Sequence, residues 1–423
     1  MLVELTSEEF NLYSSKHKNS IFFESSYWGE LKLGTGWISY FIGYKTDKIE
    51  AATLLLAKKI PVINKYIFYS PRGFLIDYKN KELVKKFTEE IAKFVKNKKG
   101  IFFKINPMLI YQERDINGDI VEDGINNKDV VKYLKEIGYQ HVGLTNDYGK
   151  DIEPRWISVL DLKDKTYEDI YNGYNKLKKR HMKSISKLNF KLVEIDKSRM
   201  DEYKKMMSST SVRRGFIDRP LSYYNKMYDV FKPNDIIKVM FVEINFKEKL
   251  DQDIAKLNEL NSKIESEKNK NKVNENLINE LVRQTESINK TIKEDKEYIE
   301  KYGSKDIPIS SGLFMCFGPE VVYLFGANYE EFMNLNGATY LMDQMIKYAI
   351  DNNFERYNFY GITGHFETDH PMYGLFDFKR GFGAHVEELI GEFTYVTDKF
   401  NYQLYKIMKK CYSIMKKVKK WLE

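Results

Sequence analysis

Residues 246–303 constrain the fold most, because their composition departs abruptly from that of the surrounding chain. The segment is rich in Lys, Glu, Asn and Gln, has no proline, and spaces isolated aliphatic residues at helical intervals. A polar stretch at 267–276 divides it into two runs and favours a chain reversal. The aliphatic positions are Leu250, Ile254, Leu257 and Ile264, then Leu277, Leu281, Ile288, Ile292 and Ile299. We predict an antiparallel two-helix coiled coil with arms of roughly 36 Å.

The segments on either side of this coil, 236–244 (IIKVMFVEI) and 309–317 (ISSGLFMCF), both read as strands. The coil is therefore expected to be inserted within the sheet of one domain. A chain of 423 residues with 43% hydrophobic content is also longer than one ordinary core needs. The expected divisions are a first domain at 1–152, a second at 153–245 plus 304–396, the coil at 246–303 and a C-terminal helix at 397–423.

Both halves of the chain repeat a pattern in which strands precede a helix and a returning strand. In the first half the strands are expected at 37–44, 51–60, 67–70 and 101–105, with a helix at 81–96. In the second half, helices are expected at 167–188, 199–207, 223–231 and 337–352. This repetition predicts an α/β fold with two GNAT-like (acyltransferase) domains and an inserted antiparallel coiled-coil arm.

The start of the chain, MLVELTSEEF, lacks the basic and apolar regions of a signal peptide, and no run approaches the ~18 apolar residues of a spanning helix. A cytoplasmic location is therefore expected. Cys316 and Cys411 are too few and too separate for a disulfide framework or a zinc site, which suits a reducing compartment.

Basic residues gather in two places, although the net charge of +7 is modest for this length. The first place is 176–191, where basic side chains lie over apolar residues at helical spacing. They are Lys178, Lys179, Arg180, Lys183 and Lys187. Such a face suits the phosphates of an RNA or of a lipid head group, and an ordinary solvated helix face fits the pattern equally well.

The second basic cluster is the C-terminal segment 402–423, whose apolar residues step by three and four. They are Leu404, Met408, Cys411, Met415, Val418 and Leu422. The lysines lie largely off this stripe, so the segment predicts an amphipathic basic helix. Two roles stay open for it, namely docking on a globular domain and peripheral contact with the inner face of an anionic membrane.

Residues 357–393 carry the most informative functional pattern, YNFYGITGHFETDHPMYGLFDFKRGFGAHVEELIGEF. A glycine turn, the pair Phe378 and Lys379, and a second turn with Gly381 and Gly383 lie between runs that read as strands. Because glycine weakens strands, its repeated use indicates special backbone geometry or close approach by a ligand.

This segment resembles the Fem family of aminoacyltransferases, whose pattern there is roughly Y-G-I-[ST]-G, then G-[LV]-x-x-F-K-x-G-F-G and E-x-x-G-x-F. Further similar motifs follow in the family's order along the chain. They are FFESSYWGELK at 22–32, with Glu24 where the family usually has Gln, YSPRG at 69–73, RRGFIDRPLSYY at 213–224 and YLFGA at 323–327. Several Fem proteins also have an inserted helical hairpin at the place of the predicted coil.

The resemblance implies an enzyme that forms a peptide bond for the cell wall. An aminoacyl-tRNA would donate Gly, Ala or Ser to the side-chain amine of the stem peptide in a lipid-linked or UDP-linked muropeptide precursor. No metal, coenzyme A or other cofactor is implied. Lys379, with Phe378 beside it, matches the family lysine that lies near the tRNA terminus and stabilises the tetrahedral oxyanion.

The same resemblance supplies candidates for substrate binding. Lys32, Arg219 and Tyr223 match family contacts to the diphosphate of the precursor, which favours forked arginine donors. Arg213 and Tyr323 are further candidates, and the sequence does not separate Arg219 from the nearby arginines. The candidates for tRNA contact are Lys179, Arg180, Lys183 and Lys187.

Two other functions stay open. One is an acyl-CoA-dependent N-acyltransferase, although the helix start at 335–339 is poor in the glycines of a diphosphate cradle. The other is a non-catalytic paralogue that binds tRNA or precursor. His365 and His370 bracket two carboxylates and superficially resemble a metal cluster, but their spacing is not that of a known zinc motif.

Overall fold

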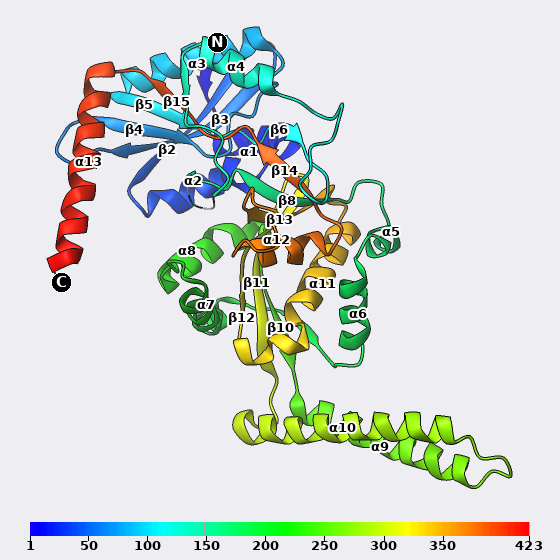
Figure 1. Cartoon of the computed structure of the whole chain (residues 1–423). Coiled ribbons are helices and arrows are strands. Elements are labelled where there is room, and N and C mark those ends of the chain that lie inside the picture. The colour runs from blue at the N-terminus through cyan, green and yellow to red at the C-terminus, as the bar shows by residue number, and fades with distance from the viewer. Residues whose placement is uncertain (148, 150, 423) are drawn as a thin grey trace.

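The computed structural model of the protein describes residues 1–147, 149 and 151–422. The chain forms two twisted sheets with helices packed on them, and a helical arm extends from the second sheet (Figure 1). The predicted fold class, α/β with two sheets and an inserted helical arm, is confirmed.

The first sheet has seven strands and two differently covered faces. Alternate residues of its third strand point to opposite sides, so that Leu55 packs toward α3 (Lys81–Asn97) and Leu54 toward α1 (Ser7–Lys16) and α2 (Ser26–Leu33). The strand order is β1 (Leu2–Glu4), β2 (Trp37–Lys45), β3 (Ile49–Lys59), β4 (Tyr66–Ser70), β5 (Gly100–Ile105), β15 (Phe393–Val396) and β7 (Tyr139–His141).

The second sheet has eight strands and is likewise covered on both faces. α11 (Gly337–Asp351) packs on one face, and α7 (Met200–Arg214) and α8 (Leu221–Phe231) pack on the other. The strand order is β6 (Ile110–Glu113), β14 (His385–Leu389), β8 (Trp156–Asp161), β13 (Arg356–Ile362), β12 (Glu320–Asn328), β11 (Ile307–Phe317), β10 (Ile237–Ile244) and β9 (Lys191–Glu194).

One hydrophobic cluster joins the two sheets into a continuous core. It contains Phe22 and Trp28 from the first half of the chain and Phe231 and Leu313 from the second, with the Phe22 and Phe231 rings 6.5 Å apart. Because this cluster buries aromatic side chains from both halves, the two sheets are held in a fixed relation. Side chains from both halves can therefore form one site.

Sheet membership departs from the predicted division of the chain at two strands. β15 falls in the range expected for the second domain, yet it pairs with β5 and β7 of the first sheet. β6 falls in the range expected for the first domain, yet it pairs with β14 of the second sheet. Each exchanged strand satisfies backbone groups that would otherwise form an open edge, which a pattern within one segment does not reveal.

Each sheet contains one parallel strand pair joined by a helix. In the first sheet β4 and β5 are parallel and α3 connects them, and in the second sheet α11 connects the parallel pair β12 and β13. The other strand pairs described in both sheets are antiparallel. This repeated unit is the GNAT-like arrangement that the sequence predicts.

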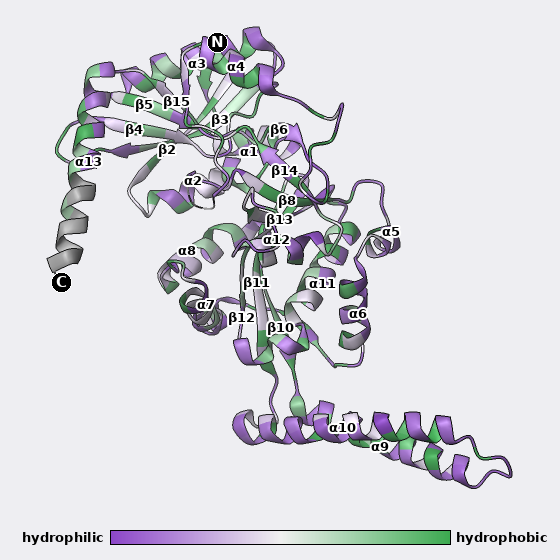
Figure 2. Ribbon diagram, viewed as in Figure 1, coloured by the Kyte–Doolittle hydropathy of each residue, from purple (hydrophilic) through white to green (hydrophobic). Residues whose placement is uncertain are grey.

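The arm consists of α9 (Phe246–Lys268) and α10 (Glu275–Tyr302), which pack against each other and are largely hydrophilic on the outside (Figure 2). Leu260, Ile264 and Leu281 form its outer apolar contact. Ile254 and Leu277, both expected in the seam, are 38% and 37% exposed instead. Near the base, Lys249 Nζ lies 2.7 Å from Asp295 Oδ2, so a buried ion pair replaces part of the apolar seam.

The helix expected at 167–188 is two helices, α5 (Tyr167–Asn172) and α6 (Lys176–Ile185). The Asn175 side chain accepts a hydrogen bond from the Lys178 N–H and caps the start of α6, which breaks the longer helix. The two remaining helices are α4 (Lys128–Glu136) and α12 (Tyr373–Arg380), in addition to the C-terminal α13 (Lys399–Leu422).

The C-terminal helix α13 docks on the first sheet through a face that includes Met408 of the predicted stripe but otherwise differs from it among the described side chains. Tyr402, Tyr405 and Met408 pack near Phe102 and Ile101. Of the predicted stripe, Leu404 is 36% exposed, and Cys411 and Met415 are also exposed. The side chains of Val418 and Leu422 lie outside the part that the structure describes. None of the described helices has the length and apolar character needed to span a membrane.

Glu24 is fully buried in the first half of the chain. Its Oε2 accepts the Leu54 N–H at 2.6 Å, and its Oε1 accepts hydrogen bonds from the hydroxyls of Ser70 (3.1 Å) and Thr53 (3.2 Å). Burial raises the pKa of Glu24 to about 8, more than these hydrogen bonds lower it. The carboxyl is therefore neutral through most of the physiological range, and the site resembles one built for an uncharged amide.

We expect Glu24→Gln to remove a pH dependence of stability. The pKa of Glu24 is higher in the folded state than in the unfolded state, so its contribution to the free energy of unfolding is fully present below pH ~4.5 and is lost as pH rises toward about 8. At pH 5 the variant and the parent should unfold at similar denaturant concentrations. At pH 8 the variant should be more stable, by a few kcal/mol at most. If urea titrations gave the same difference in stability between variant and parent at pH 5 and at pH 8, the raised pKa of Glu24 would be contradicted.

Candidate active site

Lys379 lies between the strands β13 and β14, as the sequence predicts, in a short helix, α12, that the sequence pattern did not indicate. The side chain is 4% exposed, and its Nζ donates hydrogen bonds to the carbonyls of Gly361 (2.7 Å) and Tyr360 (3.2 Å). Among the described residues no carboxylate forms an ion pair with it. Burial lowers the pKa of Lys379 to about 7. Because an ammonium carries three N–H donors, the third remains available to a substrate oxygen.

A bulge in β13 brings these two carbonyls to Lys379. The register between β13 and β8 shifts between Asn358 and Tyr360, and Tyr360 adopts a φ of +65°. Such a φ is unusual for an aromatic residue, and the Asn358 side chain stabilises it by accepting the Tyr360 N–H at 2.8 Å. The bulge therefore aims consecutive carbonyls at one ammonium, which a regular strand with alternating carbonyls does not do.

Lys178 is a second buried lysine at this place, and sequence reasoning missed it by grouping it with a solvated basic face. Its Nζ lies 3.6 Å from the centroid of the Phe378 ring and 4.5 Å from that of Phe382. The hydroxyl of Thr339, in the first turn of α11, is 3.4 Å away. A Cβ at Gly381 would lie 2.8 Å from Lys178 Cε, so a larger residue there would require the Lys178 side chain to shift.

The environment of Lys178 is unusual for a cation. The residue is 4% exposed, and burial lowers its pKa to about 7, while Asp377 raises the pKa by a smaller amount. Aromatic faces attract a cation and replace part of its lost hydration. The contact therefore ties α6 to α12 and fixes the ring of Phe378, the neighbour of Lys379.

A second cluster combines side chains from both halves of the chain. Lys32 in α2 lies with its Nζ 4.1 Å from the Trp28 ring centroid and 6.0 Å from that of Tyr223 in α8. The guanidinium of Arg219 lies 5.5 Å from the same Tyr223 ring. Burial lowers the pKa of Lys32 to about 8, and the charge of Arg219 lowers it further while that of Glu153 opposes this. The structure thus brings three of the predicted substrate-binding residues together.

Glu153, Arg72 and Tyr360 connect the two clusters. The Tyr360 hydroxyl donates a hydrogen bond to Glu153 Oε2, while the Tyr360 carbonyl accepts from Lys379. The Arg72 guanidinium lies 5.9 Å from the Tyr360 ring centroid. Burial raises the pKa of Glu153, and the charges of Arg72, Lys32 and Arg219 lower it. Tyr360 therefore contacts the Lys379 site with its backbone and the cationic cluster with its side chain.

Two predicted substrate-binding residues lie apart from these clusters. Arg213 donates to the Asn328 carbonyl at 3.3 Å and contacts Met333, so the end of α7 is tied to the second sheet. Tyr323 in β12 stacks on Phe314 with ring centroids 5.3 Å apart. Its hydroxyl occupies the space that a Cβ at Gly326 would need. Of the two arginines, Arg219 is the one placed beside Lys32 and Tyr223.

The four predicted tRNA-contacting residues lie on or just after α6. Arg180, Lys183 and Lys187 are exposed, and Lys179 is half-buried with its Nζ 2.8 Å from the Asn172 carbonyl. This basic face begins one residue after Lys178.

The predicted histidine loop forms contacts of its own. The rings of His365 and His370 stack with centroids 4.4 Å apart, and His365 Nε2 lies 3.2 Å from Asp147. Within residues 1–147, 149 and 151–422 no group of three or more His, Cys, Asp or Glu side chains is arranged to hold a metal ion.

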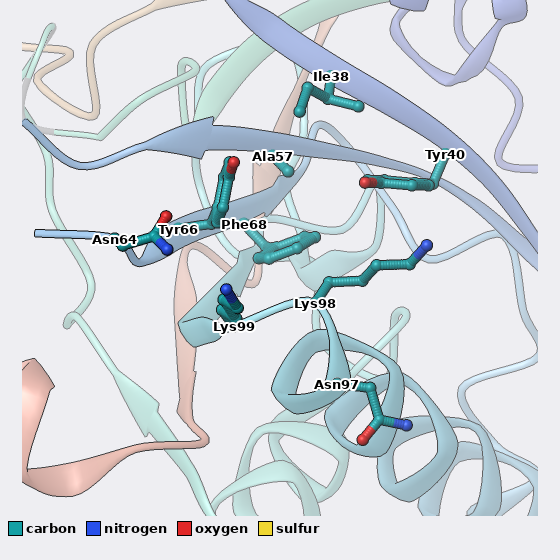
Figure 3. A pocket seen from close by; sticks show the side chains of 9 residues that line it. All are labelled: Ile38, Tyr40, Ala57, Asn64, Tyr66, Phe68, Asn97, Lys98 and Lys99. Carbon is teal, nitrogen blue, oxygen red and sulfur yellow. The ribbon is translucent and has the colours of Figure 1, made fainter.

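A separate hollow of about 250 Å³ lies at the end of α3 in the first sheet (Figure 3). Its walls include Tyr40, Phe68 and Lys98. The Lys98 Nζ lies 5.0 Å from the centroid of the Tyr40 ring. None of the predicted catalytic or substrate-binding residues lines it. The candidate site is therefore defined by converging side chains and not by this hollow.

The fold and the site define a two-domain α/β protein of the acyltransferase-like class, with a buried lysine next to a cluster of cations. The chain belongs to the FemAB family, whose model matches residues 5–410. It is 32% identical over 418 residues to "Aminoacyltransferase FemA" of Staphylococcus aureus strain N315, covering 96% of this chain and 97% of that protein. The FemA of the bovine strain RF122 is similar to the same extent.

A solved structure supports the same relationship. The crystal structure of FemX matches with a TM-score of 0.79 at 25% sequence identity, covering 96% of this chain and 99% of that chain. The predicted resemblance to the Fem family is therefore confirmed.

We expect Lys178→Met to alter stability in a pH-dependent way. The pKa of Lys178 is lower in the folded state, so the unfolded state binds more protons between pH ~7 and ~10.5, and parental stability should rise over that range. The variant lacks this rise, so its free energy of unfolding should exceed that of the parent most at pH 7 and below. Chemical denaturation of parent and variant across this pH range measures the difference in stability, with Lys179→Met as the matched control. A variant that loses stability at pH 6 would show that the ring contacts outweigh desolvation.

Proposed function

We propose that this protein is an aminoacyltransferase that moves Gly, Ala or Ser from an aminoacyl-tRNA to the side-chain amine of a peptidoglycan precursor stem peptide. Membership of the FemAB family and the similarity to proteins named aminoacyltransferase FemA support the reaction class. The observation that carries the proposal is the buried Lys379 ammonium, which has one N–H donor left after its two carbonyl contacts.

In the proposed reaction the acceptor amine attacks the ester carbonyl carbon of the aminoacyl group. A C–N bond forms, the carbonyl oxygen becomes an oxyanion, and the Lys379 N–H donates to it in an environment from which water is largely excluded. The C–O bond to the terminal ribose then breaks. The proton lost by the amine ends on the departing ribose oxygen, so the products are an amide and a free hydroxyl.

On the donor side, Phe378 would lie against the terminal nucleoside, and Lys178 would act as a positioning residue by holding the Phe378 ring from its buried side. The exposed basic residues of α6 would contact RNA phosphates. On the acceptor side, Lys32, Arg219 and Tyr223 would bind the diphosphate, because clustered cations suit that group.

A transfer assay tests the proposed function. Purified protein is incubated with tRNA charged with Gly, Ala or Ser and with a UDP-linked or lipid-linked stem pentapeptide, and the products are weighed by mass spectrometry. A mass gain of one residue on the stem supports the proposal and identifies the amino acid. Transfer from an acyl-CoA alone would instead indicate a coenzyme A-dependent acyltransferase, and binding of both substrates without transfer would indicate a non-catalytic paralogue.

We expect Lys379→Met to lower kcat about 10²-fold or more, because it removes the donor to the oxyanion. For the parent, kcat should fall as pH rises above about 7, since the ammonium then loses its proton. Lys379→Arg keeps a cation at high pH and should shift or remove this fall. Single-turnover rates across pH 6 to 9 would measure this pH dependence. An unchanged rate for Lys379→Met would refute the catalytic role.

We expect Arg219→Gln to raise KM for the UDP-linked precursor about tenfold or more with little change in kcat, because a charge-assisted contact to phosphate is worth about 1.5–3 kcal/mol. Arg214→Gln is the matched control, since Arg214 is exposed on the same segment. Initial rates over a range of precursor concentrations separate KM from kcat. The assignment to Arg219 fails if the control raises KM and Arg219→Gln does not.

A further inference from the structure

The docked helix α13 retains a second apolar stripe that faces solvent. Phe400 is 79% exposed, Ile407 60% and Met415 62%, and Leu404 and Cys411 between them are also exposed. Their spacing of three and four residues places them on one side of the helix. Because Tyr402, Tyr405 and Met408 make the contact with the first sheet, docking leaves this stripe uncovered.

The charge beside this stripe has one sign. Lys399, Lys406, Lys409 and Lys410 are exposed, and none of them has an ion-pair partner in the part of the chain that the structure describes. The sequence from 399 to 422 contains no Asp or Glu. An apolar stripe flanked by uncompensated lysines is typical of a helix that lies in the head-group region of an anionic bilayer.

A second exposed apolar element lies in the turn between α7 and α8. Ile217 is 97% exposed, Val212 85% and Phe216 43%. Gly215, with a φ of +71°, ends α7 and reverses the chain before Phe216 and Ile217. Arg214 and Arg219 flank these two residues in the sequence and are exposed. Adjacent exposed apolar residues with basic neighbours indicate a surface that contacts an apolar, anionic partner.

Both elements lie on the left side of the view in Figure 1, where α13 descends from the first sheet and α7 and α8 pack on the second. The α7–α8 turn also contains Arg219 of the cationic cluster, and Tyr223 of the same cluster lies in the first turn of α8. The exposed apolar side chains of the α7–α8 turn are therefore close in sequence to Arg219 and Tyr223 of the proposed acceptor site.

We propose that α13 and the α7–α8 turn form one docking surface for an anionic lipid bilayer. The stripe of α13 and the side chains of Phe216 and Ile217 would enter the head-group region, and the lysines of α13 and Arg214 would contact lipid phosphates. A second copy of the chain fits this surface less well, because symmetry would bring lysine-rich helices without carboxylates against each other. On the proposed function, docking would hold the Lys32–Arg219 cluster at the level where a lipid-linked diphosphate lies.

Vesicle flotation of the full chain tests this proposal without any activity measurement. We expect binding to vesicles of phosphatidylcholine mixed with phosphatidylglycerol, weaker binding to phosphatidylcholine alone, and weaker binding at high salt. The double variant Phe400→Ser, Ile407→Ser and the single variant Ile217→Ser should each lower the partition coefficient, the double variant about tenfold or more. Ile120→Ser, at a site that is 55% exposed elsewhere, is the matched control.

Charge variants separate electrostatic from apolar contact. Lys406→Gln with Lys410→Gln should weaken binding to the anionic vesicles and not to the neutral ones, whereas Lys290→Gln with Lys293→Gln on the arm should change neither. Circular dichroism and thermal unfolding confirm that each variant is folded. Equal flotation of the parent and the Phe400/Ile407 variant, or no flotation of the parent, would overturn the proposal. A lipid-independent dimer that this variant abolishes would assign the surface to a second copy instead.

Discussion

The candidate site depends on one buried ammonium, that of Lys379, held by two consecutive carbonyls of a bulged strand. A buried cation without a carboxylate is costly, and the protein offsets that cost with backbone dipoles from Tyr360 and Gly361. The bulge in turn requires Tyr360 to adopt a positive φ, which Asn358 stabilises. Local strain and desolvation of this kind are typical of positions where chemistry occurs.

The second requirement is that the two sheets keep a fixed position relative to each other. Lys32 comes from the first half of the chain and Arg219 and Tyr223 from the second, so their proximity depends on the shared aromatic core around Phe22 and Phe231. Glu153 and Tyr360 lie between this cluster and Lys379. The cations that would bind the acceptor are thus linked to Lys379, which would act on the donor. The link consists of Glu153, whose pKa depends on both burial and neighbouring charges, and of Tyr360.

The sequence identified most of the candidate residues but not all of the elements that carry them. The pair Phe378 and Lys379 was found from its glycine-flanked motif between two strands, but the short helix that carries it was not predicted, because short apolar runs with glycine do not distinguish a helix from other structure. Lys178 was missed because it stands among exposed basic residues of the same kind. Only its packing against Phe378 and Phe382, far along the chain, distinguishes it.

By itself the sequence determined many of the helices and strands of both halves, the insertion of a two-helix arm and the membership of the family, because each depends on residue spacing or motif order along the chain. Tertiary structure alone decided that β6 and β15 exchange sheets, that α13 docks through Tyr402, Tyr405 and Met408, and that Lys178 and Lys379 lose their water. The physical reason is that edge pairing and burial depend on which distant segments meet. No periodicity within one segment contains that information.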